Sequence, residues 1–272
     1  MLNEQIHPTA LVEDGAEIGP GVKIGPFCTV GRQVVLEERV ELVSHVAVDG
    51  RTRLGAGVKV FPFATVGLAP QDLKYQGEDT ATVIGENTQI REHCSIHRGT
   101  VTGSGITRIG ADCLLMAVVH VAHDCEIGDG VIISNNVVLG GHVTLGERAV
   151  IGGMAALLQF VRVGSGAMVG GVTGVTADVI PYGFVFGPRA RLAGLNIIGL
   201  RRRGLDKTQL HRVRAAYKFL FTGPGTFADR VAEAAYKFED DRYVAQMLEF
   251  IAHPSRHGLI TTLGRATGED EG

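Results

Sequence analysis

Residues 127–163 read IGDGVIISNNVVLGGHVTLGERAVIGGMAALLQFVRV, with an aliphatic side chain at every sixth position. The same spacing extends in both directions along the chain. It is unbroken over Ile6, Val12, Ile18, Ile24, Val30, Leu36, Leu42, Val48, Leu54, Val60 and Val66, returns at Ile84, Ile90 and Ile96, and runs again from Ile109 to Val175. Self-similarity at a short fixed period indicates a repeat architecture.

The period of six residues predicts a particular solenoid. It fits neither an amphipathic helix, with a period near 3.6, nor a half-buried strand, with a period near 2. It is the period of the left-handed parallel β-helix, in which each hexad forms one flat face and three hexads form a triangular coil. Equivalent residues on successive coils then stack about 4.8 Å apart, with the repeat aliphatic side chains inside. We therefore predict a mainly β fold, with this hexapeptide-repeat solenoid over residues 1–190.

Two segments interrupt the repeat, near residues 67–83 and 98–108. A solenoid tolerates an insertion only by extruding it, so we expect two surface loops. The first loop contains Asp72 and Lys74 in the polar run APQDLKY. Taken by itself, this run is equally typical of a solvated connection and of a binding loop.

The periodicity fades after Val175, and a small C-terminal helical domain is expected over residues 191–272. Apolar spacing, a capping box and a stop at Pro254 predict helices over residues 205–221, 227–238 and 241–252. The final GEDEG tail is expected to be disordered.

The composition bounds the class of protein. The 272-residue chain is 45% hydrophobic and has a formal net charge of −3, so nothing global directs it to nucleic acid. It has no apolar run that could span a bilayer and no signal peptide at its start, so a cytoplasmic protein without membrane insertion is expected. Each cysteine lies four places after a repeat aliphatic, where we expect core filler rather than a metal or redox site. These cysteines are Cys28, Cys94, Cys113 and Cys125.

Histidines mark a candidate site on the outside of the predicted prism. His120, His123 and His142 fall outside the inward-pointing positions of the repeat. His123, Gly141 and Gln159 follow one another at intervals of three hexads, so they are expected to stack in one column. Asp124 beside His123 could fix its tautomer and raise its basicity, which favours general-base chemistry. Three outward histidines could equally ligate Zn²⁺, and spacing alone does not exclude this.

A second feature is a concentration of positive charge. Between residues 189 and 218 there are nine Lys or Arg residues against Asp206 alone, nine minus one, or +8. Three consecutive arginines, residues 201–203, can hold phosphate by bidentate contacts. We expect an acidic partner there, either a nucleotide or an acidic carrier protein, although a solvated helix face is the usual explanation for such a run.

Six motifs together resemble one family. They are QDLKY at residues 71–75, IHRGT at 96–100, HVAHDC at 120–125, LGGHV at 139–143, IGGM at 151–154 and NIIGLRRRG at 196–204. This set, spread over essentially the whole chain, is similar to that of the acyl-carrier-protein-dependent UDP-N-acetylglucosamine O-acyltransferases, which catalyse the first step of lipid A synthesis. The resemblance implies a homotrimer with active sites between neighbouring prisms. It also implies transfer of a 3-hydroxyacyl chain from acyl carrier protein to the 3-hydroxyl of UDP-N-acetylglucosamine, with no metal and no cofactor.

The resemblance also implies roles for individual residues. By motif position, His123 would be the general base, oriented by Asp124, and the Gly141 N–H would stabilise the oxyanion. The implied substrate contacts are Asp72, Lys74, His120, His142, Gln159, Asn196 and Arg202. Gly171 matches the position that forms the floor of the acyl pocket, which implies a donor of about 12 to 14 carbons. A simple corner glycine is the alternative explanation for Gly171.

Two positions depart from the family pattern. Leu158 stands where the family often has His, and Ile198 where it often has Glu. Neither side chain can make a polar contact, so recognition of the acceptor could differ in detail, and an amino-sugar variant of the acceptor stays open. The alternatives are the related N-acyltransferase of the same pathway, a γ-class carbonic anhydrase-like zinc enzyme, and a non-enzymatic scaffold.

Overall fold

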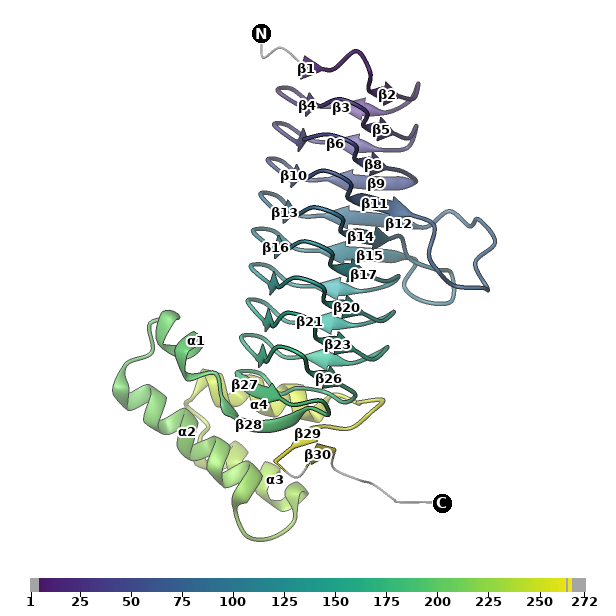
Figure 1. Ribbon diagram of the computed structural model, residues 1–272. Helices are drawn as coiled ribbons and strands as arrows, with labels where there is room; N and C mark the ends of the chain where they lie inside the picture. Colours follow the sequence, from purple (N-terminus) through teal and green to yellow (C-terminus); the bar gives the residue numbers. More distant parts are fainter. Residues whose placement is uncertain (1–4, 263, 266–272) are drawn as a thin grey trace.

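The computed structural model describes residues 5–262, 264 and 265, and these wind into a long three-sided prism of parallel strands (Figure 1). The three sheets are called A, B and C here, in the order in which the chain passes through them. Sheet A contains β1 (Gln5–Ile6), β4 (Lys23–Ile24), β7 (Glu41–Leu42), β10 (Lys59–Val60), β13 (Gln89–Ile90), β16 (Leu114–Leu115), β19 (Ile132–Ile133), β22 (Val150–Ile151), β25 (Met168–Val169), β27 (Gly183–Phe186) and β28 (Arg191–Leu195). The predicted parallel β-helix is confirmed.

The other two faces follow the same pattern. Sheet B contains β2 (Leu11–Val12), β5 (Thr29–Val30), β8 (Ala47–Val48), β11 (Thr65–Leu68), β14 (Ser95–His97), β17 (His120–Val121), β20 (Val138–Leu139), β23 (Ala156–Leu157) and β26 (Gly174–Val175). Sheet C contains β3 (Glu17–Ile18), β6 (Val35–Leu36), β9 (Arg51–Leu54), β12 (Ala81–Ile84), β15 (Ile106–Ile109), β18 (Glu126–Ile127), β21 (Thr144–Leu145) and β24 (Arg162–Val163).

The register of the sheets explains the sequence period. Val121 pairs with Leu139, and Leu139 with Leu157, so each regular coil takes up three hexads of the chain. From Ile24 onward the repeat aliphatics are therefore buried inside the prism, where burial of each such side chain contributes about 1.5–3 kcal/mol. At the open first coil Ile6 is exposed, and Val12 and Ile18 are only partly buried. The four cysteines are buried as free thiols in this core, as predicted. Burial raises the pKa of Cys125 to about 12, which keeps it protonated.

Each coil turns at three corners, and these corners organise the site. The first corner joins sheet A to sheet B, the second joins B to C, and the third joins C to A. His123 and Asp124 lie at the second corner, between β17 and β18, whereas Gly171 lies at the first, between β25 and β26.

The two interruptions of the repeat are shorter than predicted. Residues 81–84 and 106–109 pair with each other, and residues 81–84 also pair with residues 51–54, as longer strands of sheet C. The excursions are thus confined to residues 69–80 and 98–105, which project from one side of the prism (Figure 1). The six-residue period did not predict the longer strands, because these strands extend by additional backbone hydrogen bonds to their neighbours, which do not depend on the side-chain pattern.

The end of the chain is helical. Its helices are α1 (Ile197–Arg202), α2 (Lys207–Thr222), α3 (Phe227–Lys237) and α4 (Arg242–Ala252), followed by the hairpin of β29 (Ile260–Thr261) and β30 (Gly264–Arg265). The three predicted helices correspond to α2, α3 and α4, and the predicted capping box of Thr226 and Asp229 opens α3. Helix α1 was not predicted, because its six residues are too few to show a period. The GEDEG tail lies outside the described residues. Among the residues described, none of the helices is long and apolar enough to cross a membrane.

Candidate active site

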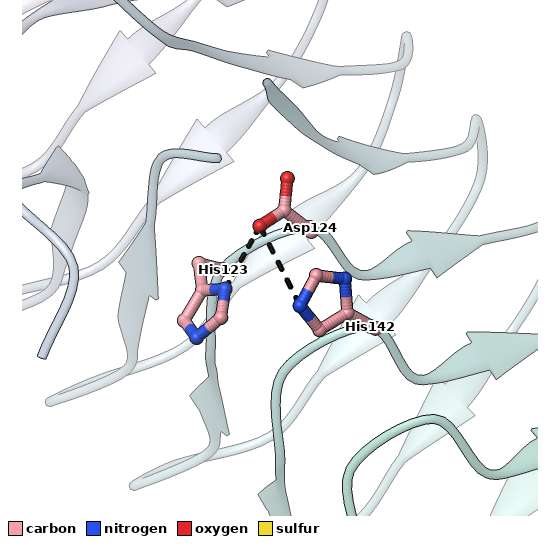
Figure 2. A group of neighbouring side chains, drawn as sticks. All are labelled: His123, Asp124 and His142. Atoms are coloured by element: carbon pink, nitrogen blue, oxygen red, sulfur yellow. Dashed lines mark hydrogen bonds and ion pairs between the residues drawn. The ribbon is translucent and has the colours of Figure 1, made fainter. Parts of the chain in front are cut away.

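A histidine and an aspartate form a hydrogen-bonded pair at the second corner. His123 Nδ1 lies 2.8 Å from Asp124 Oδ2, and the other ring nitrogen points away from the carboxylate (Figure 2). Because a carboxylate only accepts, Nδ1 carries the proton and Nε2 keeps its lone pair. His123 lies outside the prism core, as predicted, yet it is only 9% exposed, with the Gly141 backbone and the His142 ring against its imidazole. This is the arrangement of a positioned general base.

The loop at residues 98–105 wraps around the Asp124 carboxylate. Thr100 donates through Oγ1 at 2.7 Å and through its backbone N–H at 3.1 Å, and the Gly105 N–H donates at 3.1 Å. Burial acts to raise the pKa of Asp124, but the hydrogen bonds from Thr100 and His123 outweigh burial and lower that pKa below its usual value. Asp124 therefore stays ionised and fixes the imidazole.

Replacing Thr100 with valine tests this support. The variant loses the Oγ1 hydrogen bond but keeps the shape of the side chain, so we expect a loss of about 1–2 kcal/mol of stability at neutral pH. The rate of the chemical step should fall about tenfold, because the base is held less firmly. Since the folded-state pKa of Asp124 is lowered, its stabilisation is present above the unfolded-state pKa and is lost as the pH falls through the folded value.

Denaturant unfolding of both proteins from neutral to acid pH measures the effect. The stability gap between wild type and variant should narrow toward low pH. Thr29→Val, on an exposed position of β5, serves as the matched control. A gap that stays constant with pH would mean that Thr100 acts only by packing.

Gly141 and Gln159 continue the His123 column, as predicted. A Cβ atom on Gly141 would lie 2.7 Å from Cε1 of His123, so the glycine backbone rests directly against the imidazole. The Gly141 N–H donates to no acceptor among the described residues. Gln159 is exposed on the next coil, beside Gly140. An unpaired N–H next to a general base is suited to stabilising a developing oxyanion.

His142 completes the cluster. Its ring meets His123 edge-on at 5.1 Å and stacks on Phe160 at 4.3 Å. Burial is the largest influence and lowers the pKa of His142. The charges of Asp124 and Asp72 act in the opposite direction, which brings the predicted loop residue Asp72 within electrostatic range. His142 is thus a neutral hydrogen-bonding group near neutral pH.

His120 lies on the same side of the prism. Its Nδ1 is 2.7 Å from Ser95 Oγ, and its ring meets His97 edge-on at 4.9 Å. Burial is the largest effect that lowers the pKa of His97, to about 4, and Nδ1 of His97 has no hydrogen-bond partner among the described residues. His97 belongs to the motif IHRGT, but no role was predicted for it. Its position directly after Ile96, where the repeat breaks, could have marked it as a candidate site residue.

The metal alternative concerns the same residues. Three atoms that could ligate a metal, one from each of His123, Asp124 and His142, lie within 4.8 Å of one another. However, Oδ2 of Asp124 already accepts from His123 Nδ1 and Thr100 Oγ1. A bound Zn²⁺ would have to displace both hydrogen bonds, so this donor set is better suited to orienting the imidazole.

The remaining predicted residues lie elsewhere on the protomer. Asn196 caps α1 with Oδ1 and donates from Nδ2 to Gly166 O at the third corner. Arg202 is exposed in the last turn of the same helix. Lys74 is exposed in the loop at residues 69–80, where its N–H donates to Asp72. Within this chain, Asn196, Arg202 and Gly171 therefore lie at other corners of the prism than His123.

Fold and site together define a hexapeptide-repeat transferase. A family model described as bacterial transferase hexapeptide matches residues 106–141, and one described as UDP N-acetylglucosamine O-acyltransferase, domain 2, matches residues 178–260. The chain belongs to the family of acyl-(acyl-carrier-protein)–UDP-N-acetylglucosamine O-acyltransferases.

Similar proteins of that name cover nearly the whole chain. The enzyme of Rhizobium johnstonii is 48% identical over 255 residues, 94% of each chain. That of Azorhizobium caulinodans is 48% identical over 259 residues, 92% of this chain and 96% of its own. The solved UDP-N-acetylglucosamine O-acyltransferase of Moraxella catarrhalis superposes with a TM-score of 0.91 at 38% identity, covering 94% of this chain and 99% of its own.

Proposed function

We propose that this protein transfers a 3-hydroxyacyl chain from acyl carrier protein to the 3-hydroxyl of UDP-N-acetylglucosamine, the first step of lipid A synthesis, in the cytoplasm. The observation that carries the proposal is the buried His123–Asp124 pair against the Gly141 backbone, in a chain of this family. The pair provides a base for the acceptor hydroxyl, and the glycine provides a donor for the oxyanion.

The chemistry balances with these groups alone. Nε2 of His123 takes the hydroxyl proton as the acceptor oxygen attacks the thioester carbonyl carbon. The carbonyl oxygen becomes an oxyanion that the Gly141 N–H stabilises, and Asp124 stabilises the imidazolium. The oxyanion then collapses, the C–S bond breaks, and the imidazolium returns its proton to the leaving thiolate. No cofactor is required. His120, His142, Asp72, Lys74 and Gln159 are the contacts we propose for the sugar and the acyl group.

The distribution of the predicted residues over three corners supports the proposed homotrimer, whose number of subunits comes from the family resemblance. The base lies at the second corner, the acyl floor Gly171 at the first, and Asn196 and Arg202 at the third. Residues at different corners of one rigid prism cannot line one pocket. Neighbouring prisms packed side by side can bring different corners together. We therefore propose that Gly171 and Arg202 reach the site of His123 from adjacent protomers.

Two apolar residues, Leu158 and Ile198, bear on recognition of the acceptor. Leu158 and Ile198 are exposed, at 47% and 64%, and offer no polar group. The hydrogen bonds that the family often makes there are absent, so an amino-sugar form of the acceptor is the second candidate. Amide formation in place of ester formation would use the same base and oxyanion donor.

The mass of the product tests the function. Purified protein, UDP-N-acetylglucosamine and 3-hydroxyacyl carrier proteins, with a chelator present, are expected to give a mono-acylated UDP-sugar whose ester is cleaved by mild base. A base-stable amide formed only from an amino acceptor would replace the main proposal with its variant. Loss of transfer on chelation, restored by Zn²⁺, would instead favour a zinc enzyme.

A further inference from the structure

We propose that Arg256 binds the diphosphate of the nucleotide-sugar acceptor, as a cationic contact from the same protomer as His123. The inference rests on the proposed function, because it adds a residue to the same acceptor site. None of the motifs in the sequence included Arg256, which follows the last predicted helix.

The turn that carries Arg256 is fixed against the second corner. His257 Nε2 donates to Gln159 O at 2.8 Å, so the turn is hydrogen-bonded to the coil that follows the coil of Gly141. On its other side, Asp178 N donates to Gly258 O at 2.9 Å and Ile260 N donates to Asp178 O at 2.8 Å. The C-terminal segment is therefore docked on the column of the active site.

The guanidinium of Arg256 continues the stack of the His142 and Phe160 rings, which lies next to the His123 column. It lies 3.9 Å from the centroid of the Phe160 ring, and Phe160 stacks on His142 with the two ring planes only 4° apart. Arg256, Phe160 and His142 thus form a continuous stack that ends beside His123. The positive charge of Arg256 is one of the influences that lower the pKa of His142, so the charge is felt within the site. Stacking also limits the orientations of the guanidinium before a ligand binds.

The chemistry of the acceptor matches this position. No carboxylate of the described residues lies within ion-pair distance of Arg256, and its side chain is exposed. When the 3-hydroxyl of the sugar is at His123, the diphosphate on C1 lies about one hexose width away. Arg256 is separated from the His142 ring beside His123 by two contacts only, of 4.3 Å from His142 to Phe160 and 3.9 Å from Phe160 to the guanidinium. Arg202 lies at the third corner of the same chain, in α1, so of these two arginines only Arg256 stands beside the His142 ring.

Steady-state kinetics and calorimetry with UDP test the proposal. For Arg256→Ala we expect a KM for UDP-N-acetylglucosamine raised about tenfold, with kcat and the KM for acyl carrier protein within about twofold of wild type. UDP itself should bind about tenfold more weakly, and the difference should shrink at high salt. Arg256→Lys should be intermediate, because it keeps the charge but not the planar stack. Arg32→Ala, which removes an exposed arginine paired with Glu13 near the far end of the prism, is the control.

Other outcomes overturn the proposal. An unchanged KM for the UDP-sugar and unchanged UDP binding would show that Arg256 does not meet the diphosphate. A rise confined to the KM for acyl carrier protein would assign Arg256 to the carrier instead. A lower kcat together with a lower melting temperature would make the residue structural. UDP binding is measured without turnover. If the wild-type protein binds UDP but transfers no acyl chain, the proposed function is wrong, whereas the proposal for Arg256 is still tested by the binding data.

Discussion

Replacing His123 with alanine is expected to lower the rate of acyl transfer by about 10²- to 10⁴-fold, the usual contribution of a general base. Its Nδ1 is hydrogen-bonded to Asp124, and Nε2 lies beside Gly141 and points away from the carboxylate (Figure 2), so none of the described neighbouring groups is placed to take over the proton transfer. His142 is the nearest imidazole, but its ring stands edge-on to His123 and is stacked on Phe160. The loss should appear in kcat with purified substrates.

The fold should survive this change. Asp124 keeps its hydrogen bonds from Thr100 and Gly105, so removal of the imidazole leaves no unpaired buried charge. We therefore expect a melting temperature close to that of wild type. His7→Ala, which changes an exposed histidine near the N-terminus, is the matched control. Turnover of His123→Ala near the wild-type level would remove His123 from the role of base.

The fold was predictable because its defining contacts recur with a fixed sequence separation. Each coil of three hexads repeats the same inward positions, so the pairing of Val121 with Leu139 follows directly from the series of aliphatics. The same register placed His123, Gly141 and Gln159 in one column, and the structure confirms it. Extending the rule to Asp124 would also have placed His142, already a predicted site residue, in a second column with Phe160, since the two occupy the equivalent position on the next two coils.

The rest of the site depends on contacts outside the repeat. Thr100 reaches Asp124 from an extruded loop, and Arg256 reaches Phe160 from a turn that follows the whole helical region. No local period encodes such contacts. The hydrogen bonds that hold the Asp124 carboxylate have the same origin, since Thr100 and Gly105 donate to it from the loop. The register does separate Gly171 from His123, because the 48 residues between them are not a whole number of three-hexad coils. The corner of Asn196 and Arg202, which lie beyond the repeat, was visible only in the structure.

Replacing Gly171 with methionine is expected to shift the preferred acyl donor from about 12 to 14 carbons to about 10. A pocket that excludes four methylenes at about 0.8 kcal/mol each loses about 3 kcal/mol, or about a hundredfold in kcat/KM for the long donor. Gly171 lies three coils beyond His123 in the stacking order β16, β19, β22 and β25, roughly 14 Å along the prism. An acyl chain that starts at the base and follows the prism would end near this depth.

The protomer itself can accept the larger side chain. A Cβ on Gly171 would lie 3.2 Å from Gly153 O, a tight contact with backbone, and 3.9 Å from Gly153 N, and the φ of Gly171 is not in the left-handed region. A variant with methionine is therefore expected to fold after a small local shift of the backbone and to project its side chain from the first corner, where the proposed trimer would place a neighbouring prism. A donor series from 10 to 16 carbons with wild type, Gly171→Ala and Gly171→Met should show a graded shortening. A wild-type optimum at 10 carbons, or the same optimum in all three proteins, would reduce Gly171 to a corner residue and remove the argument that an adjacent protomer completes the acyl pocket.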